Sequence, residues 1–150
     1  MVKILFVCHG NICRSPMAAC LFSQMAKARG LDCVVSSAAT SREEIGNPIY
    51  PPAQRQLRAH GVPFDDHRAR QMTRADYDTY DLLIGMDGSN LAAMRRICGG
   101  DPDGKLRLLM AYTGTARDVA DPWYTGDFDA AWRDIESGCR ALLDALRSSL

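Results

Sequence analysis

The sequence predicts one α/β domain with a doubly wound, four-stranded parallel sheet and helices on both faces. Two observations favour this class. Four short apolar runs alternate along the chain with segments of helical character, which is typical of parallel sheets. No internal repeat, low-complexity tract or linker separates the 150 residues into parts. This length is enough to build one substantial core, so we expect a single domain over residues 1–150.

The four apolar runs are the predicted strands. The first, Lys3 to Val7, is short and contains β-branched residues, as expected of a strand buried on both faces. Ligands of doubly wound sheets bind beyond the carboxyl ends of the strands. Functional residues are therefore expected in the loops that follow each run. The other three runs are residues 32–37, 81–86 and 105–110.

Helices are predicted between the strands. One is expected from Ser15 to Arg29, because Pro16 suits a first helical turn and Gly30 suits a C-terminal stop. The last helix is expected after a long loop, because its apolar side chains repeat at helical spacing from Phe128 onward. Two further helices are expected, one that ends at residue 60 and one that covers residues 89–98. The long loop before the last helix covers residues 111–126.

The composition argues against several classes of protein. Basic and acidic residues balance at 18 each, so no global basic field for a nucleic-acid partner is present. No stretch approaches the ~20 apolar residues of a membrane span, and the N-terminus lacks the features of a signal peptide. The six cysteines form no C-x-x-C pair. This argues against a disulfide framework and a zinc ribbon, and it favours free thiols in the cytoplasm.

The segment VCHGNICRSP, at residues 7–16, joins the first strand to the first helix and spaces Cys8 and Arg14 as C-x5-R. Backbone N–H groups of such a loop can converge on one point, where the helix N-terminus adds partial positive charge. Gly10 is expected to permit backbone angles that other residues resist. The segment therefore predicts a phosphate-binding loop; the alternative is a helix cap with incidental thiols.

The same field favours a thiolate at Cys8. Cysteines at helix N-termini titrate between roughly 3.5 and 7.5, which makes them nucleophilic at neutral pH. Arg14 offers a planar fork that can hold two phosphoryl oxygens, and Ser15 can donate a hydrogen bond to the thiolate. A metal site made of Cys8, His9 and Cys13 is disfavoured, because the spacing is cramped and no fourth ligand is evident.

A general acid is expected at the same sheet edge, because a phenolate leaving group with a pKa near ~10 needs a proton. Two Asp-Pro pairs are candidates. Asp101 precedes the fourth strand, at the opposite edge, whereas Asp121 follows it. Trp123 and Tyr124 come next and are suited to form the wall of a pocket for a flat substrate. Asp121 is the predicted acid; the alternative is that Asp121 caps a turn and Trp123 belongs to the core.

Over nearly its full length the chain resembles the low-molecular-weight protein tyrosine phosphatases. VCHGNICRSP is similar to the family's phosphate-binding loop, and SSAAT (36–40), HGV (60–62), HRARQ (67–71), MDGSN (86–90) and DPWY (121–124) follow in the family's order. The resemblance implies a phosphocysteine intermediate on Cys8, a phosphate clamp in Arg14, and an acid that later acts as base in Asp121. It implies no cofactor and no metal.

The resemblance also implies supporting roles. Cys13 is implied as the redox partner of Cys8, through a reversible disulfide, which agrees with the vulnerability of an exposed thiolate to oxidation. From the residues alone, Cys13 could equally be a small apolar filler. The implied substrate- or phosphate-binding residues are His9, Gly10, Asn11, Ile12, Cys13, Ser15, Trp123 and Tyr124, and the implied hydrogen-bond network consists of Asn11, Ser15, Ser37 and His67.

Two positions bear on the substrate. Family members that remove phosphate from arginine prefer threonine where this chain has Ile12, so phosphotyrosine is favoured over phosphoarginine. Glu43 stands where some relatives carry an aromatic residue at the pocket rim, which leaves the peptide preference open. Two rival functions are a thiol reductase of the arsenate type, for which residues 81–94 lack the extra cysteines, and a non-catalytic phosphate-binding module, which has no need for Cys8 or Asp121.

The expected partners follow from this function. They are a phosphotyrosine-containing protein as substrate and inorganic phosphate as product, without nucleic acid or membrane insertion, and the chain is expected to be a monomer or weak dimer. Arg70 and the other scattered arginines are expected on a solvated face.

Overall fold

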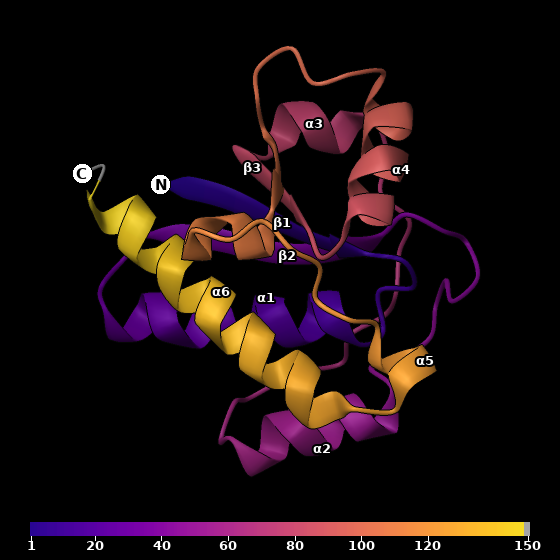
Figure 1. The fold of residues 1–150 in the computed structure, drawn as a ribbon, viewed down its shortest axis with the longest axis vertical. Helices are drawn as coiled ribbons and strands as arrows, with labels where there is room; N and C mark the ends of the chain where they lie inside the picture. Colours follow the sequence, from indigo (N-terminus) through magenta and orange to yellow (C-terminus); the bar gives the residue numbers. More distant parts are fainter. Residues whose placement is uncertain (149–150) are drawn as a thin grey trace.

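The computed structural model describes residues 1–148 and contains a four-stranded sheet in which every pairing is parallel. The strand order is β2-β1-β3-β4, and the predicted doubly wound α/β class is confirmed (Figure 1). Residues 149 and 150, the end of the predicted domain, lie outside the described residues. The strands are β1 (Val2–Cys8), β2 (Cys33–Ala39), β3 (Leu82–Gly85) and β4 (Leu106–Leu108).

The helices lie between the strands, as the alternating pattern predicts. Helix α1 (Arg14–Ala28) follows β1 directly, α4 (Gly88–Cys98) follows β3, and α6 (Phe128–Ser148) closes the described chain. None of the helices within residues 1–148 is long and apolar enough to cross a membrane. The shorter helices are α2 (Pro51–Ala59), α3 (Ala75–Thr79), the 3-10 helix η1 (Leu109–Thr113) and α5 (Pro122–Thr125).

The fourth strand is shorter than predicted. Leu109 and Met110 belong to η1 rather than to β4, although both are buried. A short apolar run does not distinguish a strand from a buried helical turn, which explains the error. The short helix α5 falls in the predicted long loop, and α3 falls in residues for which no element was predicted, because four or five residues carry too little periodicity to predict a helix.

The side chains of β1 alternate between two hydrophobic cores, one on each face of the sheet. Ile4 and Phe6 pack with residues of α1, α2, α6 and η1. Leu5 and Val7 pack with residues of α3 and α4 on the other face. Because both faces are covered, β1 is apolar throughout its centre and needs no polar side of its own.

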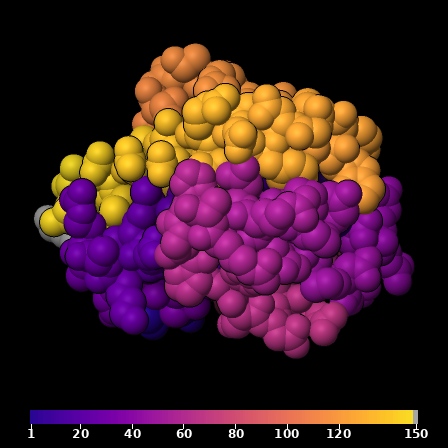
Figure 2. Space-filling model, turned by 90° about the horizontal axis from the view of Figure 1, so that it is seen from below, coloured from indigo at the N-terminus to yellow at the C-terminus, as the bar shows by residue number. Residues whose placement is uncertain are grey.

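Helix α6 lies close against its neighbours. A Cβ placed on Gly138 would lie 2.5 Å from Leu109 Cγ, so only glycine permits this approach of α6 to η1. Trp132 of α6 stacks on His60, which follows α2, with 4.4 Å between the ring centroids. Figure 2 shows the resulting face, where α6 in yellow and orange runs beside the magenta segment that contains α2.

The sheet positions the site at its topological switch point. The chain leaves β1 towards β2 on one side and later returns to β3 on the other side of β1. In doubly wound sheets, the crevice between such strands at their carboxyl ends is where ligands bind. The loop after β1, the segment after β3 and the segment before α5 all reach this end of the sheet (Figure 1).

Candidate active site

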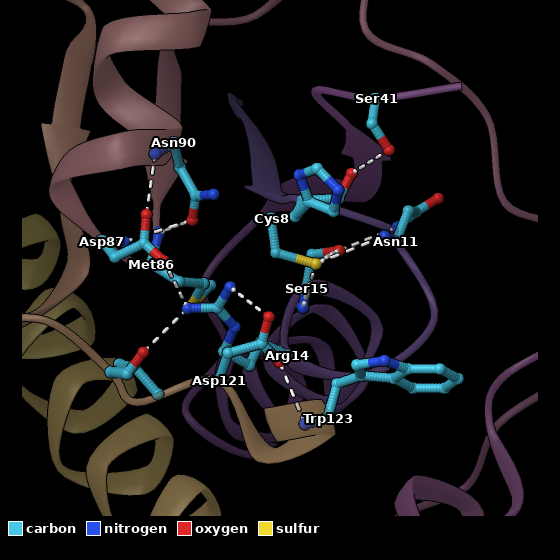
Figure 3. A network of polar contacts seen from close by, with 12 residues as sticks. Cys8, Asn11, Arg14, Ser15, Ser41, Met86, Asp87, Asn90, Asp121 and Trp123 are labelled. Atoms are coloured by element: carbon cyan, nitrogen blue, oxygen red, sulfur yellow. Dashed lines mark hydrogen bonds and ion pairs between the residues drawn. The ribbon is translucent and has the colours of Figure 1, made fainter. Parts of the chain in front are cut away.

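Cys8 is the last residue of β1, and its sulfur faces a ring of donors. The backbone N–H groups of Asn11 and Ser15 point at Cys8 Sγ, with N···S distances of 3.3 and 3.4 Å. The Ser15 hydroxyl oxygen lies 3.0 Å from the same sulfur (Figure 3). Donors that converge on one atom stabilise a negative charge there, and α1 adds the positive end of its dipole. The loop thus surrounds the sulfur of Cys8 with polar hydrogens.

The unusual backbone angle of the loop falls on Asn11, not on Gly10. Asn11 has a φ of 60°, in the left-handed region, whereas Gly10 is not among the positive-φ residues. The expectation for Gly10 is therefore wrong. What Gly10 provides is space, because a Cβ there would lie 3.3 Å from Glu44 Cγ. A left-handed asparagine costs about 1–3 kcal/mol and persists only when its surroundings hold it in place.

Those surroundings are the other three residues of the network that the resemblance implied, together with the backbone of Arg70. The Asn11 Nδ2 group donates to Ser15 Oγ at 2.8 Å and to Ser37 Oγ at 2.9 Å. Asn11 Oδ1 accepts from the Arg70 backbone N–H at 3.2 Å. The Nε2 of His67 lies 2.7 Å from the Asn11 carbonyl oxygen, which can only accept, so His67 donates. The buried amide and carbonyl of Asn11 are thus held from several elements at once.

Arg70 is more than part of a solvated face, which corrects the sequence-based expectation. Its guanidinium forms two hydrogen bonds with the carboxylate of Asp76, each 3.1 Å long. Asp76 also accepts from the Thr73 N–H at 2.8 Å, at the start of α3. The pair therefore ties the segment that supports Asn11 to α3, a contact that only the folded chain creates.

Arg14 is almost fully buried and is held by three acceptors. Its Nη1 donates to Asp87 Oδ2 at 2.8 Å and to the Val119 carbonyl at 2.7 Å, while Nη2 donates to Asp121 Oδ2 at 3.3 Å (Figure 3). Burial alone would lower the pKa of Arg14, but Cys8, Asp87 and Asp121 raise it above its ordinary value. Arg14 is therefore a fixed positive charge beside the sulfur.

Asp87 is the functional candidate that sequence reasoning missed. One of its oxygens accepts from the Asn90 N–H at 2.7 Å and caps α4, and the other accepts from Arg14. Asn90 Oδ1 in turn accepts from the N–H groups of Met86 and Asp87. The signal was present, because an Asp that follows a buried strand and precedes a helix is a typical N-cap at the ligand-binding edge.

Asp121 caps a short helix and also faces the pocket that contains Cys8. As the N-cap of α5 it accepts from the Trp123 N–H at 3.1 Å through Oδ1. Its other oxygen faces Arg14, and its side chain lines the same pocket as Cys8. Asp101, the rejected candidate, instead accepts from the Tyr77 hydroxyl and from the N–H groups of Lys105 and Leu106 at the start of β4, at the opposite end of the sheet. The topological choice between the two Asp-Pro pairs thus agrees with the structure.

The pocket has a volume of about 100 Å³ and opens to solvent. The structure brings most of the predicted binding residues to its walls, together with Glu43, which was expected at the rim, and it adds Glu44. The buried Asn11 and Ser15 and the residues Ser37 and His67 support the loop without lining this pocket. The lining residues are Cys8, His9, Gly10, Ile12, Cys13, Arg14, Glu43, Glu44, Asp121, Trp123 and Tyr124.

The rim combines aromatic and charged side chains. Trp123 is 50% exposed and Tyr124 is 80% exposed, so the interpretation of Trp123 as a core residue is wrong. The Trp123 ring packs against Tyr50, a rim neighbour that the sequence did not single out, with 4.8 Å between centroids. On the other side, Glu43 Oε2 lies 3.0 Å from His9 Nε2.

Cys13 lines the same pocket as Cys8. Burial, followed by the nearby charges of Cys8 and Asp121, raises the pKa of the Cys13 thiol far above its usual range. Cys8 and Cys13 are both free thiols in this structure. Cys98 ends α4 at the end remote from Cys8. Within residues 1–148, no group of three or more histidine, cysteine or acidic side chains is placed to hold a metal ion.

Fold and site together define an α/β protein in which a cysteine sulfur faces the backbone N–H groups of a loop at the carboxyl end of the sheet. The profile of the family "Low molecular weight phosphotyrosine protein phosphatase" matches residues 3–150. The low molecular weight protein-tyrosine-phosphatase YfkJ of Bacillus subtilis is 38% identical over 151 residues, which cover 98% of this chain and 97% of that protein. The human low molecular weight phosphotyrosine protein phosphatase is 37% identical over 149 residues, or 95% and 94% of the two chains.

Solved structures agree with the sequence relatives. The crystal structure of YfkJ matches with a TM-score of 0.95 and covers 99% of this chain and 96% of that one, at 38% identity. A Drosophila arginine phosphatase matches with a TM-score of 0.89 at 30% identity and covers 97% and 98%. The chain belongs to the low molecular weight phosphotyrosine protein phosphatase family, and it is an enzyme, a protein-tyrosine-phosphatase.

Proposed function

We propose that this enzyme hydrolyses phosphotyrosine in proteins through a phosphocysteine formed on Cys8, with Asp121 as general acid and then general base. One observation carries the proposal: a sulfur that two backbone N–H groups and the Ser15 hydroxyl contact shares a small pocket with a buried arginine and a carboxyl group. Nucleophile, charge clamp and proton donor are the groups that phosphoryl transfer to sulfur requires.

In the first step, Cys8 Sγ attacks phosphorus and the bond from phosphorus to the phenolic oxygen breaks. Asp121, protonated, gives its proton to the departing oxygen, so that tyrosine leaves neutral. The N–H groups of the loop and the guanidinium of Arg14 stabilise the charge on the equatorial oxygens. Ser15 Oγ, 3.0 Å from the sulfur, is placed to stabilise the thiolate before attack.

In the second step, water attacks the phosphocysteine and the sulfur–phosphorus bond breaks. Asp121, now a carboxylate, accepts the proton of the water. The products are inorganic phosphate and the Cys8 thiolate, which the same donors stabilise as a leaving group. The cycle consumes only water and needs no metal.

The aromatic rim supports phosphotyrosine as substrate. The exposed rings of Trp123 and Tyr124, which line the pocket together with Cys8, suit contact with a phenyl ring whose phosphate lies at Cys8. A phosphoserine is too short to span such a slot. Because an arginine phosphatase shares the fold, the choice against phosphoarginine rests on Ile12, which lines the pocket.

Hydrolysis of p-nitrophenyl phosphate tests the residue assignments. Cys8→Ser is expected to lose turnover while it still binds phosphate, and Asp121→Ala is expected to lose roughly 10² or more in rate. Asp101→Asn is the matched control, since it alters the other Asp-Pro pair at the opposite end of the sheet. An active Cys8→Ser enzyme would refute the mechanism.

Substrate choice is tested separately with peptides that carry phosphotyrosine, phosphoserine or phosphoarginine. Turnover is expected on phosphotyrosine, and Ile12→Thr is expected to raise activity on phosphoarginine. Equal turnover of phosphoserine and phosphotyrosine would refute the aromatic-slot interpretation.

We further propose that the enzyme acts as a monomer or weak dimer in the cytoplasm on phosphoprotein substrates, without a nucleic-acid partner. Free cysteines throughout the chain and a net charge of zero support this. Sedimentation at micromolar protein concentration tests the oligomeric state, and a stable higher oligomer would contradict it.

A further inference from the structure

The segment before Asp121 is attached to the rest of the protein by consecutive residues. The first is Arg117, which forms an ion pair with Asp134 of α6: its Nη2 lies 2.6 Å from Oδ1 and its Nη1 lies 3.0 Å from Oδ2. This bidentate geometry fixes direction as well as distance. The hydrogen bonds with Asp134 also raise the pKa of Arg117.

The second attachment is Asp118, which reaches a different element. Its Oδ1 accepts from the Gly88 N–H at 3.0 Å. Gly88 is the first residue of α4, and its neighbour Asp87 is the residue that holds Arg14. Asp118 thus connects the segment that carries the acid to the helix whose N-cap orients the phosphate clamp.

The third attachment is Val119, which is completely buried. Its N–H donates to the Met86 carbonyl at 2.8 Å, and its carbonyl accepts from Arg14 Nη1 at 2.7 Å. From Val119 only Ala120 intervenes before Asp121. Two residues span at most about 7 Å, so a shift at residues 117 to 119 moves the Asp121 carboxyl directly.

We propose that Arg117, Asp118 and Asp134 are positioning residues that place the carboxyl of Asp121 for proton transfer. The proposal rests on the proposed role of Asp121 as general acid. Proton transfer requires hydrogen-bond distance to the leaving oxygen, and a misplacement of about 1 Å can cost about 10²-fold in rate. Arg117 and Asp118 lie at the surface, so their contacts can be removed without opening the core around Val119.

The test uses the dependence of kcat/KM on the leaving group. Phenyl phosphate releases a basic phenolate that needs the proton, whereas 2,4-dinitrophenyl phosphate releases a stable anion that does not. For Asp118→Ala and Arg117→Ala, we expect kcat/KM on phenyl phosphate to fall about 10-fold and on dinitrophenyl phosphate to change less than about twofold. A purely structural loss would lower kcat/KM equally on both substrates.

Two rescues sharpen the test. Asp118→Asn keeps an oxygen that can accept from Gly88, so it should retain most activity on phenyl phosphate. The double variant Arg117→Asp with Asp134→Arg exchanges the two members of the ion pair. It should recover part of the kcat/KM on phenyl phosphate that each single change loses. Arg140→Ala is the matched control, because it removes another ion pair on α6, the one between Arg140 and Glu136. It should leave kcat/KM on both substrates unchanged.

The outcomes separate the two proposals. If Asp121→Asn shows no leaving-group dependence, the proposed acid is wrong. The positioning role is refuted, while the proposed function stands, if Asp121→Asn shows the leaving-group dependence but Asp118→Ala and Arg117→Ala do not. An equal fall of kcat/KM on both substrates in Asp118→Ala and Arg117→Ala refutes it as well. Selective loss on phenyl phosphate in all three variants supports both.

Discussion

The two loops that form the pocket are built in opposite ways. The phosphate loop is buried, and Asn11 at its centre has no exposed surface and bonds to residues from β2 and from the segment around residue 70. The segment that carries Asp121 is largely exposed, and Trp123 and Tyr124 follow directly. A charge on sulfur needs donors that do not move, whereas a proton donor and an aromatic rim must admit and release a substrate.

The largest expected effect is in the rigid loop. Asn11→Ala removes the side-chain bonds to Ser15 and Ser37, leaves their hydroxyls without this donor, and places alanine at a positive φ. We expect a loss of about 2–4 kcal/mol in the free energy of unfolding and about 10²-fold in kcat. Urea unfolding and p-nitrophenyl phosphate turnover measure the two.

Asn11→Gly is the matched variant, because glycine adopts the positive φ without strain but makes no side-chain bond. It should regain part of the stability lost in Asn11→Ala and little of the activity. Wild-type turnover in either variant would show that the network does not hold the loop.

The next effect is expected at Asp87, where the two regions meet. Asp87→Ala removes both the α4 cap and the partner of Arg14, so we expect a loss of about 1 kcal/mol in stability and about 10-fold in kcat/KM. Asp87→Asn keeps an oxygen for the cap but loses the charge, so its stability should stay near wild type while kcat/KM falls. Equal destabilisation by both variants would contradict the assignment of one oxygen to the α4 cap and of the other to Arg14.

A smaller effect is expected at the exposed rim. Trp123→Ala should change the free energy of unfolding by less than about 0.5 kcal/mol, because the residue lies at the surface. It should raise KM for a phosphotyrosine peptide about threefold to tenfold, through loss of ring contact. Thermal unfolding and steady-state kinetics on the same samples test this. A large drop in melting temperature would show that the rim is structural.

The smallest effect is expected in the alkylation of Cys20, a thiol that lies outside the phosphate loop. Burial, followed by Asp65, raises the pKa of Cys20 to about 11, so below that pH Cys20 remains a protonated, slow-reacting thiol. At pH 8, iodoacetamide should therefore label Cys8 first, and phosphate should protect it. Labelling of Cys20 should increase only as the pH approaches 11. Equal labelling of both at pH 8 would contradict the special environment of Cys8.

The difference between the two loops also explains what the sequence could predict. Cys8, Arg14 and Ser15 are local to one strand–loop–helix segment, so spacing alone brought them together. Asp121 required only the order of the strands. The partners of these residues could not be predicted in the same way, because Asp87 with Arg14, Arg117 with Asp134 and Tyr50 with Trp123 are joined only by folding.

The errors have physical causes as well. The left-handed angle fell on Asn11 rather than Gly10 because buried hydrogen bonds offset its strain. The apolar residues of η1 gave the pattern of a strand because they are buried against α6. In both places, tertiary contacts overrode the local preference.

The central claim, that Cys8 carries the phosphoryl group, has a direct test. Asp121→Asn is mixed with 2,4-dinitrophenyl phosphate, quenched in acid during turnover and digested, and the peptides are examined by mass spectrometry. Because this leaving group needs no proton while hydrolysis of the intermediate needs the base, phosphoenzyme should accumulate. We predict a phosphoryl group on the peptide that contains Cys8, absent from the same experiment with Cys8→Ser. A phosphoryl group on another residue, or turnover by Cys8→Ser, would contradict the account.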